Sequence, residues 1–138
     1  EITCRDWSSD VCSSDLLGHD PANRHRIVVD GMNARPSSTE FRLRAATDHY
    51  SIIEAQPLTG RSHQIRVHIA ALGYPILGDA FYGGVGELPA LGYVADRSLL
   101  HAWVISFFHP RLEKLMTFDA PPPDDFLDLT GPIVLEIE

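Results

Sequence analysis

The sequence contains very little cysteine. Both cysteines, Cys4 and Cys12, lie among the first dozen of the 138 residues, so a disulfide-stabilised scaffold is excluded. Long apolar runs are also missing, because no stretch reaches the ~18 residues that a membrane-spanning helix needs. The N-terminus lacks the basic and apolar regions of a signal peptide. Together with a hydrophobic content of 44%, these absences predict one folded, cytoplasmic domain.

A positive net charge is missing as well. The formal net charge is −8, which argues against a general polyanion binder, because Lys and Arg supply most non-specific affinity for nucleic acids. Seven of the eleven basic residues nevertheless fall in one part of the chain: Arg24, Arg26, Arg35, Arg42, Arg44, Arg61 and Arg66. This distribution predicts a basic face on an acidic protein.

The N-terminal residues have an unusual composition. Residues 6–16 are DWSSDVCSSDL, a string that resembles a translated sequencing adapter. On this hypothesis residues 1–16 are a non-native leader, and the natural reading frame begins near Leu17.

Hydrophobic periodicity predicts strands in the first half of the chain. A short strand is expected over 26–30, followed by a polar loop through Ser38. Apolar and polar residues alternate in TEFRLRAA at 39–46, and YSIIEAQPL follows at 50–58. This pattern is typical of half-buried strands and predicts a β-hairpin.

One helix is expected between residues 62 and 73, over about three turns. Its apolar residues recur at helical spacing and form a stripe: Ile65, Ile69 and Leu72. Ser62 is placed to cap the first turn, and Gly73 stands where a left-handed residue ends a helix. His63 and Arg66 lie one turn apart on another side of this helix, facing something other than the core.

The second half of the chain contains many helix-breaking residues. The glycine- and proline-rich stretch 74–96 predicts a long loop. Residues 99–110 and 114–121 predict a second hairpin. PPPDDF at 121–126 predicts an extended segment that cannot be helical.

Four stretches resemble the RluA-type pseudouridine synthases. They are LTGRSHQIRVHIAALGYPILGDAFYGG at 58–84, LLHAWVISFFHP at 99–110, MTFDAPPPDDF at 116–126 and, more weakly, RPSSTEFRL at 35–43. The resemblance implies that residues 17–138 are the C-terminal part of a catalytic domain. It implies an α+β fold, with a mixed, largely antiparallel sheet and few helices, and a basic cleft that holds a flipped-out uridine.

The resemblance also implies the chemistry. Such an enzyme isomerises uridine to pseudouridine in RNA: an aspartate attacks, the glycosidic bond to N1 breaks, the base turns, and the sugar rejoins at C5. It needs no metal and no cofactor. The GR-S-HQIR motif matches Arg66 to the arginine that pairs with this aspartate, where a guanidinium keeps the carboxylate ionised and oriented.

Three neighbours of Arg66 are candidate RNA contacts. Arg61, His63 and Gln64 stand at the start of the helix, where N–H groups and the helix dipole favour phosphate. Helix capping and local packing explain the same three residues equally well.

The expected nucleophile is missing. The family's R-L-D motif and the tyrosine that follows it do not occur, so the chain as given is expected to be inactive. Asp79 is not expected to replace it, because an Asx-type turn with Phe81 and Tyr82 packed beneath explains GDAFYGG. No zinc site is expected, because His63 and His68 lie five residues apart on different helix faces.

Two other functions are compatible with the sequence. The first is a non-catalytic RNA-binding module that uses the basic residues from Arg24 to Arg66 to hold structured RNA. The second is a packing domain without RNA affinity, which the net charge of −8 favours. Within the synthase hypothesis, ribosomal RNA is preferred over transfer RNA, and no obligate protein partner or membrane is predicted. Without the N-terminal half, sheet edges and apolar surface are expected to be exposed.

Overall fold

The computed structural model describes residues 11–132. The chain divides into two compact units, unit 1 over Glu1–Ser98 and unit 2 over Leu99–Glu138. In the described part of the chain, no helix is long and apolar enough to cross a membrane.

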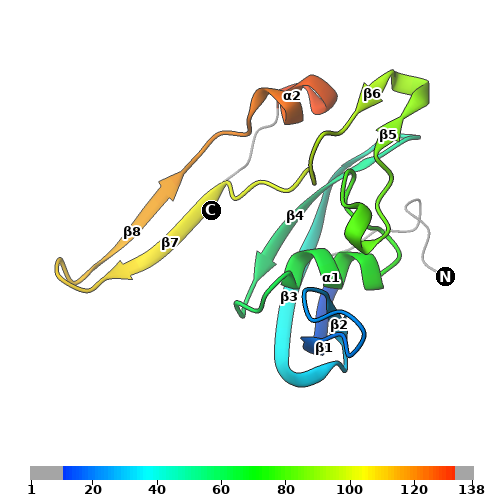
Figure 1. The fold of residues 1–138 in the computed structure, drawn as a ribbon. Coiled ribbons are helices and arrows are strands. Elements are labelled where there is room, and N and C mark those ends of the chain that lie inside the picture. Colours follow the sequence, from blue (N-terminus) through cyan, green and yellow to red (C-terminus); the bar gives the residue numbers. More distant parts are fainter. Residues whose placement is uncertain (1–10, 133–138) are drawn as a thin grey trace. The chain divides into compact units, whose positions relative to one another are not determined.

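Unit 1 is built on a four-stranded antiparallel sheet with the strand order β2-β1-β3-β4 (Figure 1). Its strands are β1 (Val11–His19), β2 (Ile27–Val29), β3 (Met32–Ala46) and β4 (Ser51–Pro57). The predicted hairpin of residues 39–58 is confirmed as β3 and β4, and the predicted strand at 26–30 is confirmed as β2.

The predicted polar loop through Ser38 is wrong, because β3 already begins at Met32. Its first half pairs with β1, for example Ser38 with Ser14 and Arg35 with Leu17. Main-chain hydrogen bonding to β1 satisfies this polar segment, so its serines do not interrupt the strand.

The predicted leader falls partly in this sheet. Residues 11–16 form most of β1, between β2 and β3, whereas residues 1–10 lie outside the described residues. That residues 1–16 are non-native stays a prediction.

Helix α1 (Gln64–Ala71) lies across the sheet of unit 1 (Figure 1). One buried cluster joins Val67 of α1 to Leu17, Ile27 and Tyr82. In the other, Phe41 and Ile69 are buried, and the residues packed against them are Leu43, Ile53, Ala55, Ile65, Leu72, Tyr74 and Ile76. The predicted apolar stripe of the helix is therefore confirmed as its core-facing side.

The ends of α1 differ in how well the sequence predicted them. Gly73 has the predicted left-handed backbone, with φ 95°. The N-terminal prediction is wrong: His63, not Ser62, is the N-cap, it has φ 53°, and no side chain caps the helix. The helix has eight residues, which is shorter than the three turns expected.

Residues 74–96 are mostly loop, as predicted, but contain short regular elements. These are the 3₁₀ turns η1 (Ala80–Tyr82) and η2 (Pro89–Leu91) and the paired two-residue strands β5 (Glu87–Leu88) and β6 (Tyr93–Val94). Prolines and glycines exclude longer elements but permit turns of this length.

Unit 2 contains the predicted second hairpin. It consists of β7 (Val104–His109) and β8 (Lys114–Asp119), which pair in continuous register. The prediction that residues 121–126 cannot be helical is wrong, because α2 (Asp124–Thr130) begins directly after Pro123. Proline is tolerated at a helix start, and Asp124 and Asp125 in the first turn complement the helix dipole.

Candidate functional site

Tyr82 is the centre of one cluster of predicted site residues. Its hydroxyl lies 2.6 Å from Nδ1 of His63 and accepts a hydrogen bond of 3.0 Å from the main-chain N–H of Ile27. The guanidinium of Arg66 stands over the Tyr82 ring, 4.8 Å from its centroid. The structure thus brings His63 and Arg66 to one side of α1, as the sequence predicted, around a tyrosine that joins α1, η1 and β2.

Arg66 is held by a carboxylate of its own unit. Its Nε donates to Oδ2 of Asp79 over 2.9 Å, and its Nη2 donates to Oδ1 over 2.8 Å. Asp79 is buried, whereas the Arg66 side chain is 23% exposed. Among the described residues Nη1 of Arg66 makes no hydrogen bond, so the end of the guanidinium away from Asp79 can take a second anion.

Two glycines permit the tight loop that contains Asp79. Gly84 approaches the main chain so closely that a Cβ there would lie 2.0 Å from the carbonyl oxygen of Ile76. Gly78 has φ 84°, and a Cβ there would lie 2.0 Å from the carbonyl oxygen of Arg97. No other residue type fits such approaches, and this tight loop sets Asp79 opposite Arg66. The predicted Asx-type turn is wrong, since the Asp79 carboxylate binds Arg66 and makes no cap hydrogen bond.

The electrostatics of this cluster favour a neutral histidine beside a charged arginine. Burial, and then the nearby Arg66 charge, lower the pKa of His63, while Asp79 acts in the opposite direction. The hydrogen bond to Asp79 raises the pKa of Arg66, which stays protonated. The ring of Phe81, a residue that is 40% exposed, makes T-shaped contacts with the rings of His63 and Tyr82.

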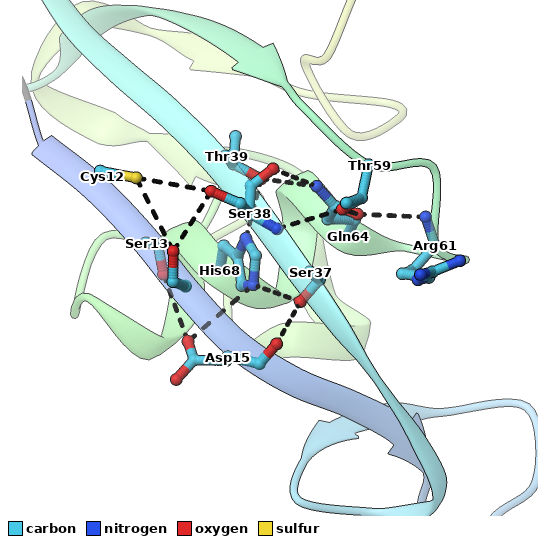
Figure 2. Close-up of polar contacts among 11 residues, drawn as sticks. Cys12, Ser13, Asp15, Ser37, Ser38, Thr39, Thr59, Arg61, Gln64 and His68 are labelled. Carbon is cyan, nitrogen blue, oxygen red and sulfur yellow. Dashed lines mark hydrogen bonds and ion pairs between the residues drawn. The ribbon is translucent and has the colours of Figure 1, made fainter.

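Gln64 lies apart from this cluster, in a buried polar layer between α1 and the sheet (Figure 2). Its Oε1 accepts hydrogen bonds from Thr59 Oγ1 over 2.6 Å and from the Arg61 N–H over 3.1 Å. Its Nε2 donates to Ser38 O over 2.8 Å and to Thr39 Oγ1 over 2.9 Å. All these partners belong to the protein, and the side chain is buried.

His68 belongs to the same layer and is completely buried. Its Nδ1 lies 2.8 Å from Thr39 Oγ1, and its Nε2 lies 3.1 Å from Ser37 Oγ. The Asp15 carboxylate lies farther away, 3.9 Å from Nε2. Burial lowers the pKa of His68, and Asp15 only partly opposes this.

Arg61 bridges the loop before α1 to β3. Its Nε donates to the carbonyl oxygen of Pro36 over 3.0 Å, and its main-chain N–H donates to Oε1 of Gln64. Among residues 11–132 no hydrogen bond joins Arg61 to Arg66, so the structure places the four predicted residues in two groups: Arg61 with Gln64, and His63 with Arg66.

A second cation lies near Tyr82. The guanidinium of Arg26, an exposed residue, is 5.6 Å from the centroid of the same ring. Sequence reasoning counted Arg26 only as part of a basic stretch, and it missed the pairing of Asp79 with Arg66, which lie 13 positions apart. The one sequence signal for this pairing was an acid in a glycine-rich loop after the helix.

No protein-family profile matches the chain, but its curated relatives are consistent with one another. It is 43% identical over 112 residues to an uncharacterized RNA pseudouridine synthase of Chloroflexus aurantiacus, which covers 79% of this chain and 33% of the relative. It is 42% identical over 100 residues to the dual-specificity RNA pseudouridine synthase RluA of Escherichia coli, which covers 72% of this chain and 44% of the relative.

The chain is a homologue of the RluA-type RNA pseudouridine synthases. A third relative, the ribosomal large subunit pseudouridine synthase D of Vibrio vulnificus, is 38% identical over 122 residues, or 83% of this chain and 37% of its own length. The chain spans between 33% and 44% of the length of these pseudouridine synthases.

The solved structures agree with the sequence relatives. Human RNA pseudouridylate synthase domain containing 1 superposes with a TM-score of 0.69 at 27% identity, over 83% of this chain and 49% of that one. The predicted fold class is thereby confirmed: a mostly antiparallel sheet with two helices that matches about half of a pseudouridine synthase domain.

Proposed function

We propose that the complete protein isomerises uridine to pseudouridine in structured RNA and that this chain supplies the C-terminal, RNA-facing part of its catalytic domain. The homology over 72–83% of the chain to pseudouridine synthases supports this proposal. The nucleophile lies outside this chain, because no R-L-D sequence occurs in it. We therefore expect the chain by itself not to convert uridine.

In this proposal Arg66 pairs with the nucleophilic aspartate of the complete domain. Asp79 takes the Nε and Nη2 edge of the guanidinium and so fixes its plane. The Nη1 end remains for the second carboxylate, which the positive charge keeps ionised and oriented. Asp79 itself is buried and paired, and serves to hold Arg66.

Arg61 and His63 are the proposed RNA contacts. His63 is neutral beside Arg66, so it offers RNA a hydrogen-bonding ring rather than a charge, while Arg61 offers the remaining N–H groups of its guanidinium to phosphate. Gln64 was expected to touch RNA as well. We propose that it acts indirectly, by holding Arg61 in place, because its side-chain amide already binds the main chain of Arg61.

The target RNA is proposed to be ribosomal, with transfer RNA as the alternative. One relative is a ribosomal large subunit synthase and another a dual-specificity RNA synthase by name. Transcripts of both classes can be compared as substrates.

The test is to restore the upstream reading frame from the source locus and to measure pseudouridine in RNA. We expect conversion by the restored protein, and loss of conversion in its Arg66→Gln variant. The matched control is Arg44→Gln, since Arg44 lies in an exposed ion pair with Glu54 on the β3–β4 hairpin. An absence of conversion by a folded, restored protein would overturn the proposed function.

A further inference from the structure

The buried polar layer under α1 contains hydrogen bonds whose directions can be deduced. The amide orientation of Gln64 is fixed, because one end faces the N–H donor of Arg61 and the other faces the carbonyl oxygen of Ser38. Its Nε2 therefore donates to Thr39 Oγ1. The only proton of Thr39 is then available for the remaining neighbour of its hydroxyl, Nδ1 of His68. Nδ1 is therefore an acceptor, and the neutral ring carries its proton on Nε2.

The hydrogen bonds on the other side of His68 indicate the same tautomer independently. The hydroxyl of Ser37 donates its single proton to the carbonyl oxygen of Asp15 over 2.7 Å. Towards Nε2 of His68 it can therefore act only as an acceptor, so Nε2 carries the proton. Since the final acceptor is a main-chain oxygen, this arrangement does not depend on which side chain occupies position 15.

These hydrogen bonds join into one continuous hydrogen-bond chain. It runs from the Ser38 N–H through Thr59 to Gln64, and from Gln64 through Thr39, His68 and Ser37 to the main chain of β1 (Figure 2). Gln64 in this chain also binds the Arg61 N–H. The direction of every proton in the chain is consistent only with one tautomer of His68.

We propose that Thr39, Gln64 and His68 are positioning residues that hold the Arg61 loop against the sheet through this hydrogen-bond chain, which is complete only while His68 is neutral and protonated on Nε2. The role in RNA binding rests on the function proposed above, whereas the proton arrangement does not. Within residues 11–132, no side-chain hydrogen bond joins this hydrogen-bond chain to the Tyr82 cluster.

Protonation of His68 would break the hydrogen-bond chain at a defined place. With a proton on Nδ1 as well, the Thr39 hydroxyl would receive two donors and its own proton would lack an acceptor at a completely buried position. The charged group that faces His68 is Asp15 of β1, 3.9 Å from Nε2. From β3 only the hydroxyls of Ser37 and Thr39 face it, and on α1 itself Gln64 is uncharged.

The direct test is nitrogen NMR of the histidine rings in the full chain. We expect His68 to carry its proton on Nε2 and to be mostly neutral at about pH 6.5, the ordinary pKa of histidine. A neutral ring with its proton on Nδ1, or a ring that is already protonated on both nitrogens above that pH, would overturn the proposal. This measurement needs neither RNA nor a variant.

Gln64→Glu tests the direction of the chain. The carboxylate can still accept from Thr59 and Arg61 but cannot donate, so the Thr39 proton should turn towards it. Nδ1 of His68 would then face an acceptor while Ser37 still requires a proton on Nε2, so His68 should take up a second proton at a higher pH than in the parent chain, which the same NMR experiment detects. A His68 ring that takes up its second proton at the same pH in both proteins would show that Gln64 does not set the direction of the Thr39 proton.

Thr39→Val and Thr39→Ser test the positioning role as a matched pair. Valine removes the hydroxyl at similar volume, whereas serine keeps it. Hydrogen exchange of the Arg61 amide should become about fivefold to tenfold faster with valine and stay unchanged with serine, while the amides of the β3–β4 ladder keep their protection. Equal exchange in both variants would overturn the positioning role.

RNA affinity separates this proposal from the proposed function. We expect Thr39→Val and Arg61→Gln to weaken RNA binding and Thr39→Ser to leave it unchanged. If the NMR and exchange results hold but Arg61→Gln has no effect on RNA, the chain of hydrogen bonds stands and the RNA role of the loop is overturned.

Discussion

The two units of this chain bury their apolar residues to very different degrees. All six buried hydrophobic side chains of the described residues lie in unit 1: Leu17, Ile27, Phe41, Val67, Ile69 and Tyr82. In unit 2, by contrast, the β7–β8 hairpin exposes large side chains on both strands, among them Ile105, Phe108 and Leu115. Unit 1 can therefore hold a site in a fixed geometry, whereas the hairpin has apolar surface that suits a further layer of protein.

The largest predicted effect is a loss of stability, which should be much greater for a core substitution in unit 1 than for a substitution in the hairpin of unit 2. Phe41→Ala removes a side chain that is 1% exposed, and should lower the free energy of unfolding by about 3–5 kcal/mol. Phe108→Ala removes one that is 63% exposed, and should change it by less than about 0.5 kcal/mol. Urea unfolding measures both. Equal losses would contradict the contrast between a packed unit and an open hairpin.

The next effect concerns the ion pair that holds Arg66. Asp79→Asn should destabilise unit 1 by about 2–3 kcal/mol, which is less than the ~3–5 kcal/mol of a wholly buried pair because Arg66 is partly exposed. Glu54→Gln, which breaks the more exposed pair with Arg44, should cost at most about 0.5 kcal/mol. Similar costs for the two variants would show that Asp79 contributes no more than a surface charge.

RNA binding should also distinguish the units. Replacing Arg24 and Arg26 of unit 1 by glutamine should weaken RNA binding about tenfold and reduce the salt dependence by about one phosphate contact each. Replacing Arg111 and Lys114 of unit 2 in the same way should have a smaller effect. Filter binding over a range of salt concentrations measures both, and a larger loss from the unit 2 variant would place the RNA on the hairpin instead.

The most gradual effect is a dependence of stability on pH. Because the pKa of His68 and that of His63 are lowered in the folded chain, their stabilising contribution is complete above the unfolded value of about 6.5 and is lost as the pH falls through the folded values. Urea unfolding at pH 7.5 and at lower pH should show this loss before most carboxylates are protonated. A stability that stays constant between about pH 7 and 5 would contradict it.

The sequence predicted those parts of the fold that local patterns control. Alternation identified both hairpins, and the spacing of Ile65, Ile69 and Leu72 identified the buried side of α1. It failed where a partner decides the outcome: the serines of β3 form a strand because β1 pairs with them. The three prolines led to the wrong prediction that no helix forms here, because Pro123 precedes the first turn of α2 and does not interrupt it.

The sequence predicted that His63 and Arg66 share one side of α1, but not the contacts that they make there. The side shared by His63 and Arg66 follows from helical spacing, and the structure gives both a place at Tyr82. The partner of Arg66 could not be inferred, because the loop that brings Asp79 to it depends on close approaches at Gly78 and Gly84. The buried role of His68 likewise depends in part on the hydroxyl of Ser37, which lies in the half of β3 that was predicted to be a loop.

Pseudouridine formation, measured by the chain alone and with its upstream reading frame restored, tests the central claim most directly. We predict no conversion of uridine by the 138-residue chain and conversion by the restored protein, with RNA bound by both. Conversion by the chain alone would show that a nucleophile lies within it, and a folded, restored protein that binds RNA without converting it would contradict the proposed activity.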